Sequence, residues 1–185
     1  MDTSHKGKVV LVTGAGNGIG KAIALRFAEA GAHVVVNDVN GQSAEDVKNE
    51  ICDSGGSAIA VEADVSNSDE VAEMFKKATS NFETVDVLVN NAGLISPMLH
   101  FFEADETWWR RIIDVNLTGH FLCSQHAARL MAKKGAGVII NMSSGGATRA
   151  HRAFCAYDAS KGGIEALTRA MALDLGPYGI RVCVR

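Results

Sequence analysis

The chain has 185 residues, 47% of them hydrophobic and 21% charged, with a formal net charge of -3. This length fits one domain with a sizeable core, so we expect a single domain over residues 1–185. The small negative charge argues against nucleic acid or an anionic membrane surface as a partner, and no apolar stretch is long enough to cross a bilayer. Residues 1–8 are polar and carry no signal-peptide pattern, which favours a cytoplasmic protein.

The cysteines and histidines give no metal or disulfide pattern. The four cysteines form no CxxC pair, which favours reduced thiols. No cluster of His, Cys and Asp has the spacing of metal ligands, so we expect no metal site.

Short apolar runs alternate with longer amphipathic stretches along the whole chain. In chain order the sequence predicts strand 8–13, helix 18–30, strand 33–37, helix 42–54, strand 57–63, helix 67–80, strand 86–90, helix 104–132, strand 137–142, helix 157–175 and strand 181–184. Ser66 or Asn67 is the predicted N-cap of the third helix.

The predicted strands are continuously apolar and do not alternate with polar residues, as in Val34-Val35-Val36 and Val138-Ile139-Ile140. This pattern is typical of strands covered on both faces. It predicts an α/β fold in which a doubly wound parallel sheet has helices on both faces.

A glycine-rich turn joins the first strand to the first helix over residues 13–20. Gly14 permits the tight turn, Gly18 allows close backbone approach to a pyrophosphate, and Gly20 allows the helix to pack near the sheet. Free N–H groups and the helix dipole favour an anion at this helix start. The spacing is GxxxGxG, and its position between a strand and a helix predicts a dinucleotide site.

Asp38 closes the second predicted strand, where its carboxylate can accept hydrogen bonds from ribose hydroxyls and would repel a 2′-phosphate. No Arg or Lys is adjacent to it in the sequence, and Asn17 in the glycine turn is neutral. We therefore predict NAD rather than NADP. The structural alternative is that Asp38 only begins a loop.

Tyr157 and Lys161 share a helical face because they stand four residues apart. A nearby ammonium favours the phenolate form of a tyrosine, which makes it a better base. Ser144 follows the fifth strand, where its hydroxyl could hold a substrate oxygen. A surface pair on a helix would explain Tyr157 and Lys161 alone, but not together with Ser144 and the glycine turn.

From about residue 8 to its end, the chain resembles the short-chain dehydrogenase/reductase family, which has a Rossmann-like fold. The resemblance rests on Thr13–Gly20, Asp64-Val65, Asn90–Gly93, Asn116, Ser144, Tyr157 and Lys161. It implies that Asp64 and Val65 contact adenine, that Asn116 holds a water that relays protons from Lys161, and that Lys161 also binds the nicotinamide ribose. The implied cofactor residues are Gly14, Asn17, Gly18, Ile19, Gly20, Asp38, Val39, Asp64, Val65, Asn91, Ala92, Gly93, Tyr157 and Lys161. The implied catalytic residues are Asn116, Ser144, Tyr157 and Lys161.

The resemblance implies an NAD-dependent oxidoreductase of small carbonyl or alcohol substrates. It also implies a homo-oligomer, a dimer or homotetramer, joined through the helices that carry Asn116 and Tyr157. Members of the family usually continue past the sixth strand, so we expect the last strand or strands and a substrate lid to be missing here. The alternative is a truncated, non-catalytic product that binds NAD or other subunits. A dinucleotide-sensing regulator has no DNA-binding feature to support it.

Overall fold

The computed structural model describes residues 5–185. Residues 1–4 lie outside the described residues. They are the first part of the segment 1–8, in which the sequence shows no signal-peptide pattern. The strands are β1 (Val9–Val12), β2 (His33–Asp38), β3 (Ser57–Glu62), β4 (Val87–Asn90), β5 (Gly137–Asn141) and β6 (Ile180–Val184). The α-helices are α1 (Gly18–Glu29), α2 (Gly41–Asp53), α3 (Ser68–Phe82), α4 (Glu106–Ile113), α5 (Gly119–Lys134) and α6 (Cys155–Leu175). A π-helical turn, η1 (Asp114–Thr118), joins α4 to α5, and two short 3-10 turns are η2 (Gly145–Ala147) and η3 (Gly176–Tyr178).

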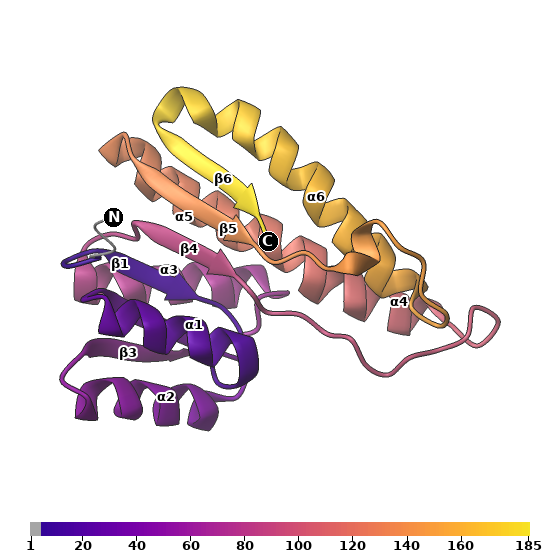
Figure 1. Cartoon of the computed structure of the whole chain (residues 1–185), viewed down its shortest axis with the longest axis horizontal. Helices are drawn as coiled ribbons and strands as arrows, with labels where there is room; N and C mark the ends of the chain where they lie inside the picture. Colours follow the sequence, from indigo (N-terminus) through magenta and orange to yellow (C-terminus); the bar gives the residue numbers. More distant parts are fainter. Residues whose placement is uncertain (1–4) are drawn as a thin grey trace.

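The six strands form one parallel sheet in the order β3-β2-β1-β4-β5-β6 (Figure 1). The chain builds outward from β1 to β3 and then returns to place β4 on the other side of β1. This reversal opens a crevice at the carboxyl ends of β1 and β4, where open α/β sheets bind ligands. The predicted doubly wound parallel sheet is confirmed.

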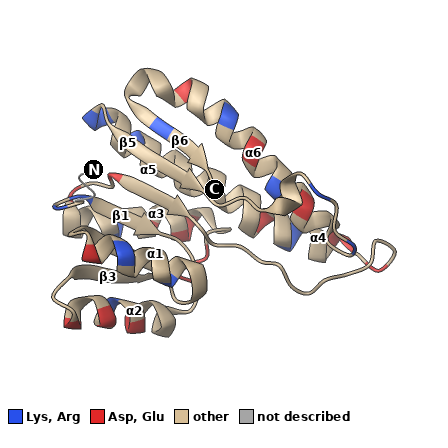
Figure 2. Ribbon diagram, viewed as in Figure 1, with Lys and Arg blue, Asp and Glu red and all other residues tan. Residues whose placement is uncertain are grey.

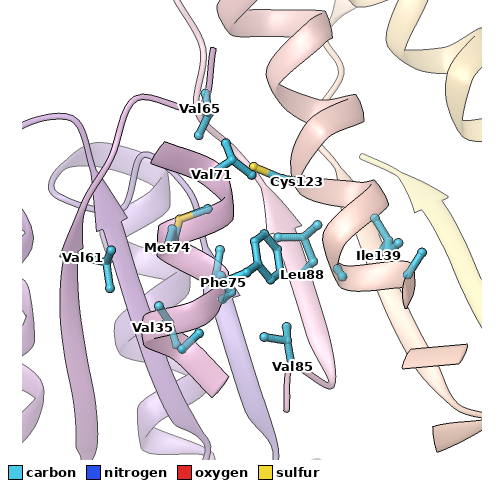
Figure 3. Packing of buried hydrophobic residues seen from close by; sticks show 14 of the residues in the cluster. Val35, Val61, Val65, Val71, Met74, Phe75, Val85, Leu88, Cys123 and Ile139 are labelled. Atoms are coloured by element: carbon cyan, nitrogen blue, oxygen red, sulfur yellow. The ribbon is translucent and has the colours of Figure 1, made fainter. Parts of the chain in front are cut away.

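The two faces of the sheet bury separate hydrophobic clusters because successive side chains of a strand point to opposite faces. Val10, Val12 and Val34 pack with residues of α1 and α2 on one face. On the other face, Leu11, Val35 and Leu88 pack with residues of α3 and α5, and Met74 and Phe75 are among the buried residues of α3 in this cluster (Figure 3). Burial of each large side chain stabilises the fold by roughly 1.5–3 kcal/mol.

Charged side chains lie mainly on the helices and loops, and the strands carry few of them (Figure 2). This distribution matches strands that are covered on both faces. No helix within residues 5–185 has the length and apolar character that a bilayer span needs.

The predicted ends of the elements differ from the observed ends by no more than two residues. Asn67 is the N-cap of α3, since its side chain accepts the N–H groups of Asp69 and Glu70. One prediction needs correction: the uninterrupted helix over 104–132 is divided by η1, which contains Asn116. The cause is tertiary, because the Asn116 side chain is bonded to the backbone of Leu94, which lies after β4.

Candidate active site

A pocket of about 390 Å³ lies at the carboxyl ends of β1, β2 and β4, at the reversal of strand order. The predicted cofactor residues that line it are Gly14, Asn17, Ile19, Gly20, Asp38, Val39, Asp64, Val65, Asn91, Ala92 and Gly93. Gly18, Tyr157 and Lys161 do not line it. The structure thus brings most of the predicted cofactor set to one cavity.

The glycine turn has the conformation that its residues permit. Gly14 has φ +59°, and a Cβ at this position would lie 2.9 Å from the Cα of Ala92. A Cβ on Gly20 would collide with the carbonyl oxygen of Gly14, so the start of α1 can lie against the turn only with glycine there. Gly18 has φ +53°, and a Cβ at this position would have no atom within 4 Å. Glycine is therefore favoured there by the backbone conformation and not by close packing.

Asp38 ends β2 and is 8% exposed. Its Oδ2 accepts the Gly16 N–H at 2.9 Å, and its Oδ1 accepts the Asn40 N–H at 3.0 Å. A carboxylate has about four acceptor positions, so these two bonds leave capacity for ribose hydroxyls. Gly16 is a residue that the sequence reasoning missed: a Cβ there would lie 2.8 Å from Asp38 Oδ2. The signal for it was one further glycine in the turn.

Thr13 and Asn91 join the loops that follow β1 and β4. The Thr13 hydroxyl accepts the N–H groups of Asn91 and Ala92, both at 3.0 Å. The Asn91 side chain donates to the carbonyl oxygens of Thr13 and Gly14, again at 3.0 Å. These four bonds fix the floor of the pocket. Thr13 was predicted only as part of the motif and not as a site residue.

Asp64 and Val65 lie at another wall of the pocket, after β3. Asp64 Oδ1 accepts the N–H of Ser66 at 2.9 Å and its hydroxyl at 2.7 Å, which fixes the turn after the strand. The side chain of Val65 is 5% exposed and packs against Gly119, where a Cβ would lie 2.8 Å from Val65 Cγ2. The turn therefore presents both residues to the pocket.

Tyr157 and Lys161 lie together on the first turns of α6. The Lys161 Nζ donates to the carbonyl oxygen of Met142 at 2.7 Å and lies 5.5 Å from the centroid of the Tyr157 ring. Lys161 is 5% exposed, and burial lowers its pKa to about 8.

Ser144 and Tyr157 approach each other through η2. The Ser144 hydroxyl accepts the Gly146 N–H at 3.3 Å and caps this short turn. A Cβ on Gly146 would lie 3.3 Å from Cε1 of Tyr157, so the turn packs directly on the tyrosine ring. Gly146 therefore links Ser144 to Tyr157, which in turn lies next to Lys161.

Asn116 is fully buried in η1. Its Oδ1 accepts the Leu94 N–H at 2.6 Å, and its Nδ2 donates to the Leu94 carbonyl at 2.9 Å and to Ser160 Oγ at 3.1 Å. Leu94 lines the pocket and Ser160 precedes Lys161, so Asn116 connects the pocket wall to the helix with Tyr157 and Lys161. Its predicted role of holding a water stays a prediction.

Arg111 is a second residue that the sequence reasoning missed. Arg111 lies on α4 and lines the pocket, as does Val115, which follows one helical turn later. Its neighbour Arg110 instead pairs with Glu106 on the same helix. Only the packing of α4 against the loop after β4 distinguishes the two arginines, so the sequence carried no signal for this role.

The described residues, 5–185, contain no group of three or more His, Cys, Asp or Glu side chains placed to hold a metal ion. The polar groups that the candidate site offers are the Asp38 carboxylate, the Ser144 hydroxyl, the Tyr157 phenol and the Lys161 ammonium.

Residues 8–184 match a family model described as short chain dehydrogenase. Cis-4-hydroxycyclohexanecarboxylate dehydrogenase of Sinomonas cyclohexanicum is 42% identical over 184 residues, which cover 98% of this chain and 73% of that protein. The 3-oxoacyl-[acyl-carrier-protein] reductase of a Synechocystis species is 42% identical over 181 residues, which cover 97% of this chain and 73% of that protein.

Solved structures show the same fold. A 7 alpha-hydroxysteroid dehydrogenase, complexed with NADH and 7-oxo glycochenodeoxycholic acid, superposes with a TM-score of 0.95 at 39% identity over 99% of this chain and 71% of its own. A gluconate 5-dehydrogenase from Burkholderia cenocepacia, in complex with NADP and tartrate, superposes with a TM-score of 0.93 at 33% identity over the same shares of the two chains.

Proposed function

The chain belongs to the short-chain dehydrogenase family of oxidoreductases, and we propose that it transfers a hydride between NAD and a carbonyl or secondary alcohol substrate. In this proposal residues 1–185 act as one catalytic domain, and Tyr157 is the general acid and base. The observation that carries the proposal is that Asn116 connects a pocket lined by Asp38 to the helix on which Lys161 Nζ lies 5.5 Å from the centroid of the Tyr157 ring.

The residues around the pocket fit a dinucleotide. The turn at Gly14 and the start of α1 offer backbone N–H groups to a pyrophosphate, and Asp38 keeps acceptor capacity for ribose hydroxyls. When bound, the nicotinamide cofactor supplies the hydride acceptor or donor. Since one solved relative contains NADH and another NADP, our choice of NAD rests on Asp38, whose negative charge disfavours a 2′-phosphate.

The protein's own residues move and hold the proton. In the direction of reduction, the Tyr157 hydroxyl donates its proton to the carbonyl oxygen of the substrate. In the reverse direction, the Tyr157 phenolate accepts the proton of the substrate alcohol. The Lys161 ammonium stabilises the resulting phenolate, while the Ser144 hydroxyl orients the same oxygen. Asn116 maintains the distance between the pocket wall and α6 through Leu94 and Ser160.

Turnover by the wild type and by Tyr157→Phe tests this proposal. The substrate panel would include a hydroxycyclohexanecarboxylate, a 3-oxoacyl thioester and a 7-hydroxysteroid, the substrates that the relatives' names suggest. We expect Tyr157→Phe to lose about 100-fold or more in kcat while its Kd for NADH stays unchanged. Equal rates for the two proteins would reject the catalytic proposal and leave the non-catalytic NAD-binding alternative.

We also propose that the protein self-associates through α5 and α6. An apolar groove between them is lined by Phe121, Ala128, Met171 and Tyr178, and the side chains of Phe121 and Tyr178 are 46% and 55% exposed. Such exposed aromatic residues around a groove are typical of an interface. Sedimentation of the wild type and of Phe121→Glu tests this. We expect the charge to shift the protein to monomers, and an unchanged state would contradict the proposal.

A further inference from the structure

Outside the pocket, His151 and Asp158 join the segment 144–154, which follows β5, to the first turn of α6. Asp158 Oδ2 accepts the backbone N–H of His151 at 2.9 Å, and Asp158 Oδ1 lies 3.0 Å from His151 Nδ1. The Asp158 side chain is 18% exposed, compared with 46% for that of His151. One carboxylate, next to Tyr157 in the chain, therefore holds both the backbone and the ring of a residue seven positions earlier.

The start of the same segment fills the space between Asp158 and Tyr157. Gly146 is buried there, and a Cβ at its position would collide with Asp158 Oδ1 and lie 3.3 Å from Tyr157 Cε1. The Gly146 N–H in turn donates to Ser144 Oγ. Gly146 therefore lies against both Asp158 and Tyr157, and its N–H connects this contact to Ser144.

The end of the segment is also directed toward Tyr157. The Phe154 ring lies 5.8 Å, centroid to centroid, from both the His151 ring and the Tyr157 ring, and it meets the latter edge to face at 79°. Between His151 and Phe154, Ala153 has φ +65°. A residue with a Cβ keeps this conformation only where its surroundings enforce it, and the bonds of His151 to Asp158 supply that constraint.

We propose that Asp158 and His151 are positioning residues that hold segment 144–154 in the shape that places Ser144 and Phe154 around Tyr157. Backbone bonds of η2 fix residues 144–149. Among the described residues, the side-chain hydrogen bonds that join residues 150–154 to α6 are those between His151 and Asp158. The inference rests on the proposed function, because Asp158 and His151 affect catalysis only if Ser144 and Tyr157 have the roles proposed above.

Kinetics of four variants test the positioning role: Asp158→Ala, Asp158→Asn, His151→Ala and the control Arg152→Ala. Because small displacements of catalytic groups are costly, we expect Asp158→Ala and His151→Ala to lose about tenfold or more in kcat/KM, with an unchanged Kd for NADH. Asp158→Asn keeps an oxygen that can accept the His151 N–H, so it should recover most of the activity. Arg152 is exposed on the same segment and has no ion pair among the described residues, so its variant should match the wild type.

Hydrogen–deuterium exchange of the amides of residues 145–154 gives a readout that does not depend on turnover. We expect faster exchange in Asp158→Ala and His151→Ala than in the wild type or Arg152→Ala. Unchanged exchange, or wild-type kcat/KM in Asp158→Ala, would overturn the inference. A loss of NADH binding equal to the loss of activity would also overturn it, because the damage would then extend beyond the segment. Faster exchange in Asp158→Ala and His151→Ala, combined with no turnover by the wild type, would support the role of the pair in holding the segment while rejecting the proposed function.

Discussion

Asp38 illustrates how one side chain serves both the fold and the candidate site. Its carboxylate accepts two backbone N–H groups, from Gly16 and Asn40, and its charge faces the pocket. The bond to Gly16 ties the glycine turn to the end of β2, so the two parts of the predicted dinucleotide site are coupled through a single residue.

Replacing Asp38 by Asn should reverse part of the predicted preference for NAD. The amide removes the negative charge that disfavours a 2′-phosphate and weakens hydrogen bonds from ribose hydroxyls. A hydrogen bond to a charged group is worth about 1.5–3 kcal/mol, so the ratio of the Kd values for NADPH and NADH should fall by about tenfold or more. Calorimetric titration with both cofactors measures this ratio, and an unchanged ratio would contradict the role given to Asp38.

Arg111 should contribute to binding of an anionic cofactor, whereas Arg110 should not. Both arginines are exposed on α4, but only Arg111 lines the pocket. We expect Arg111→Ala to weaken NADH binding by about fivefold, a surface-charge effect below about 1 kcal/mol that salt reduces. The matched variant Arg110→Ala removes an equal charge one residue away. Equal effects of the two substitutions would mean that the net charge, not the pocket position, matters.

At the scale of elements, the sequence predicted the strands and helices closely because their signals are local. The apolar run Val34-Val35-Val36 and the cap at Asn67 need no knowledge of distant residues. The π-turn could not be predicted, because it accompanies the contact of Asn116 with Leu94, 22 positions away in the chain. The roles of Gly16 and Arg111 were missed for the same reason: each depends on which elements meet in space.

Helix α5 carries His120, which is 1% exposed and whose Nε2 has no hydrogen-bond partner among residues 5–185. Burial, together with the charge of Lys161, lowers the pKa of His120 to about 3. The folded state therefore binds this proton more weakly than the unfolded state. The contribution of neutral His120 to the free energy of unfolding is fully present above pH 6.5 and is lost as the pH falls from 6.5 toward 3.

Replacing His120 by Gln should flatten the decrease in stability on acidification. The pKa shift from 6.5 to about 3 corresponds to a change in stability on the order of 5 kcal/mol over that whole range, of which roughly 3 kcal/mol falls above pH 4. Urea unfolding of both proteins between pH 7 and 4 gives the free energy of unfolding at each pH. Carboxylates titrate in both proteins, so the difference in slope isolates His120. Parallel slopes would show that the pKa of His120 is the same in the folded and the unfolded protein.

At the scale of the whole molecule, the fold creates the site by where it changes direction. The reversal between β3 and β4 places the loops after β1 and β4 side by side at the carboxyl end of the sheet (Figure 1). The hydrogen bonds of Asn116 in η1 to Leu94 and Ser160 then join the loop after β4 to α6, which carries Tyr157 and Lys161. Strand β6 forms one edge of the sheet, and the side chain of Val184 on it is 37% exposed. The pocket and the proposed catalytic residues are therefore built from segments that span residues 13 to 161 and that meet at the carboxyl end of the sheet.

The most direct test of whether the pocket at the carboxyl end of the sheet binds NAD is a thermal melt of the 185-residue chain with and without saturating NADH or NADPH. NADH at about 100 times its Kd adds about 2.7 kcal/mol to the free energy of unfolding. For a domain of this size the account predicts a cooperative melt whose Tm rises by roughly 5–10 °C with NADH, and by less with NADPH at the same concentration. A melt that responds to neither cofactor, or that rises more with NADPH, would contradict it.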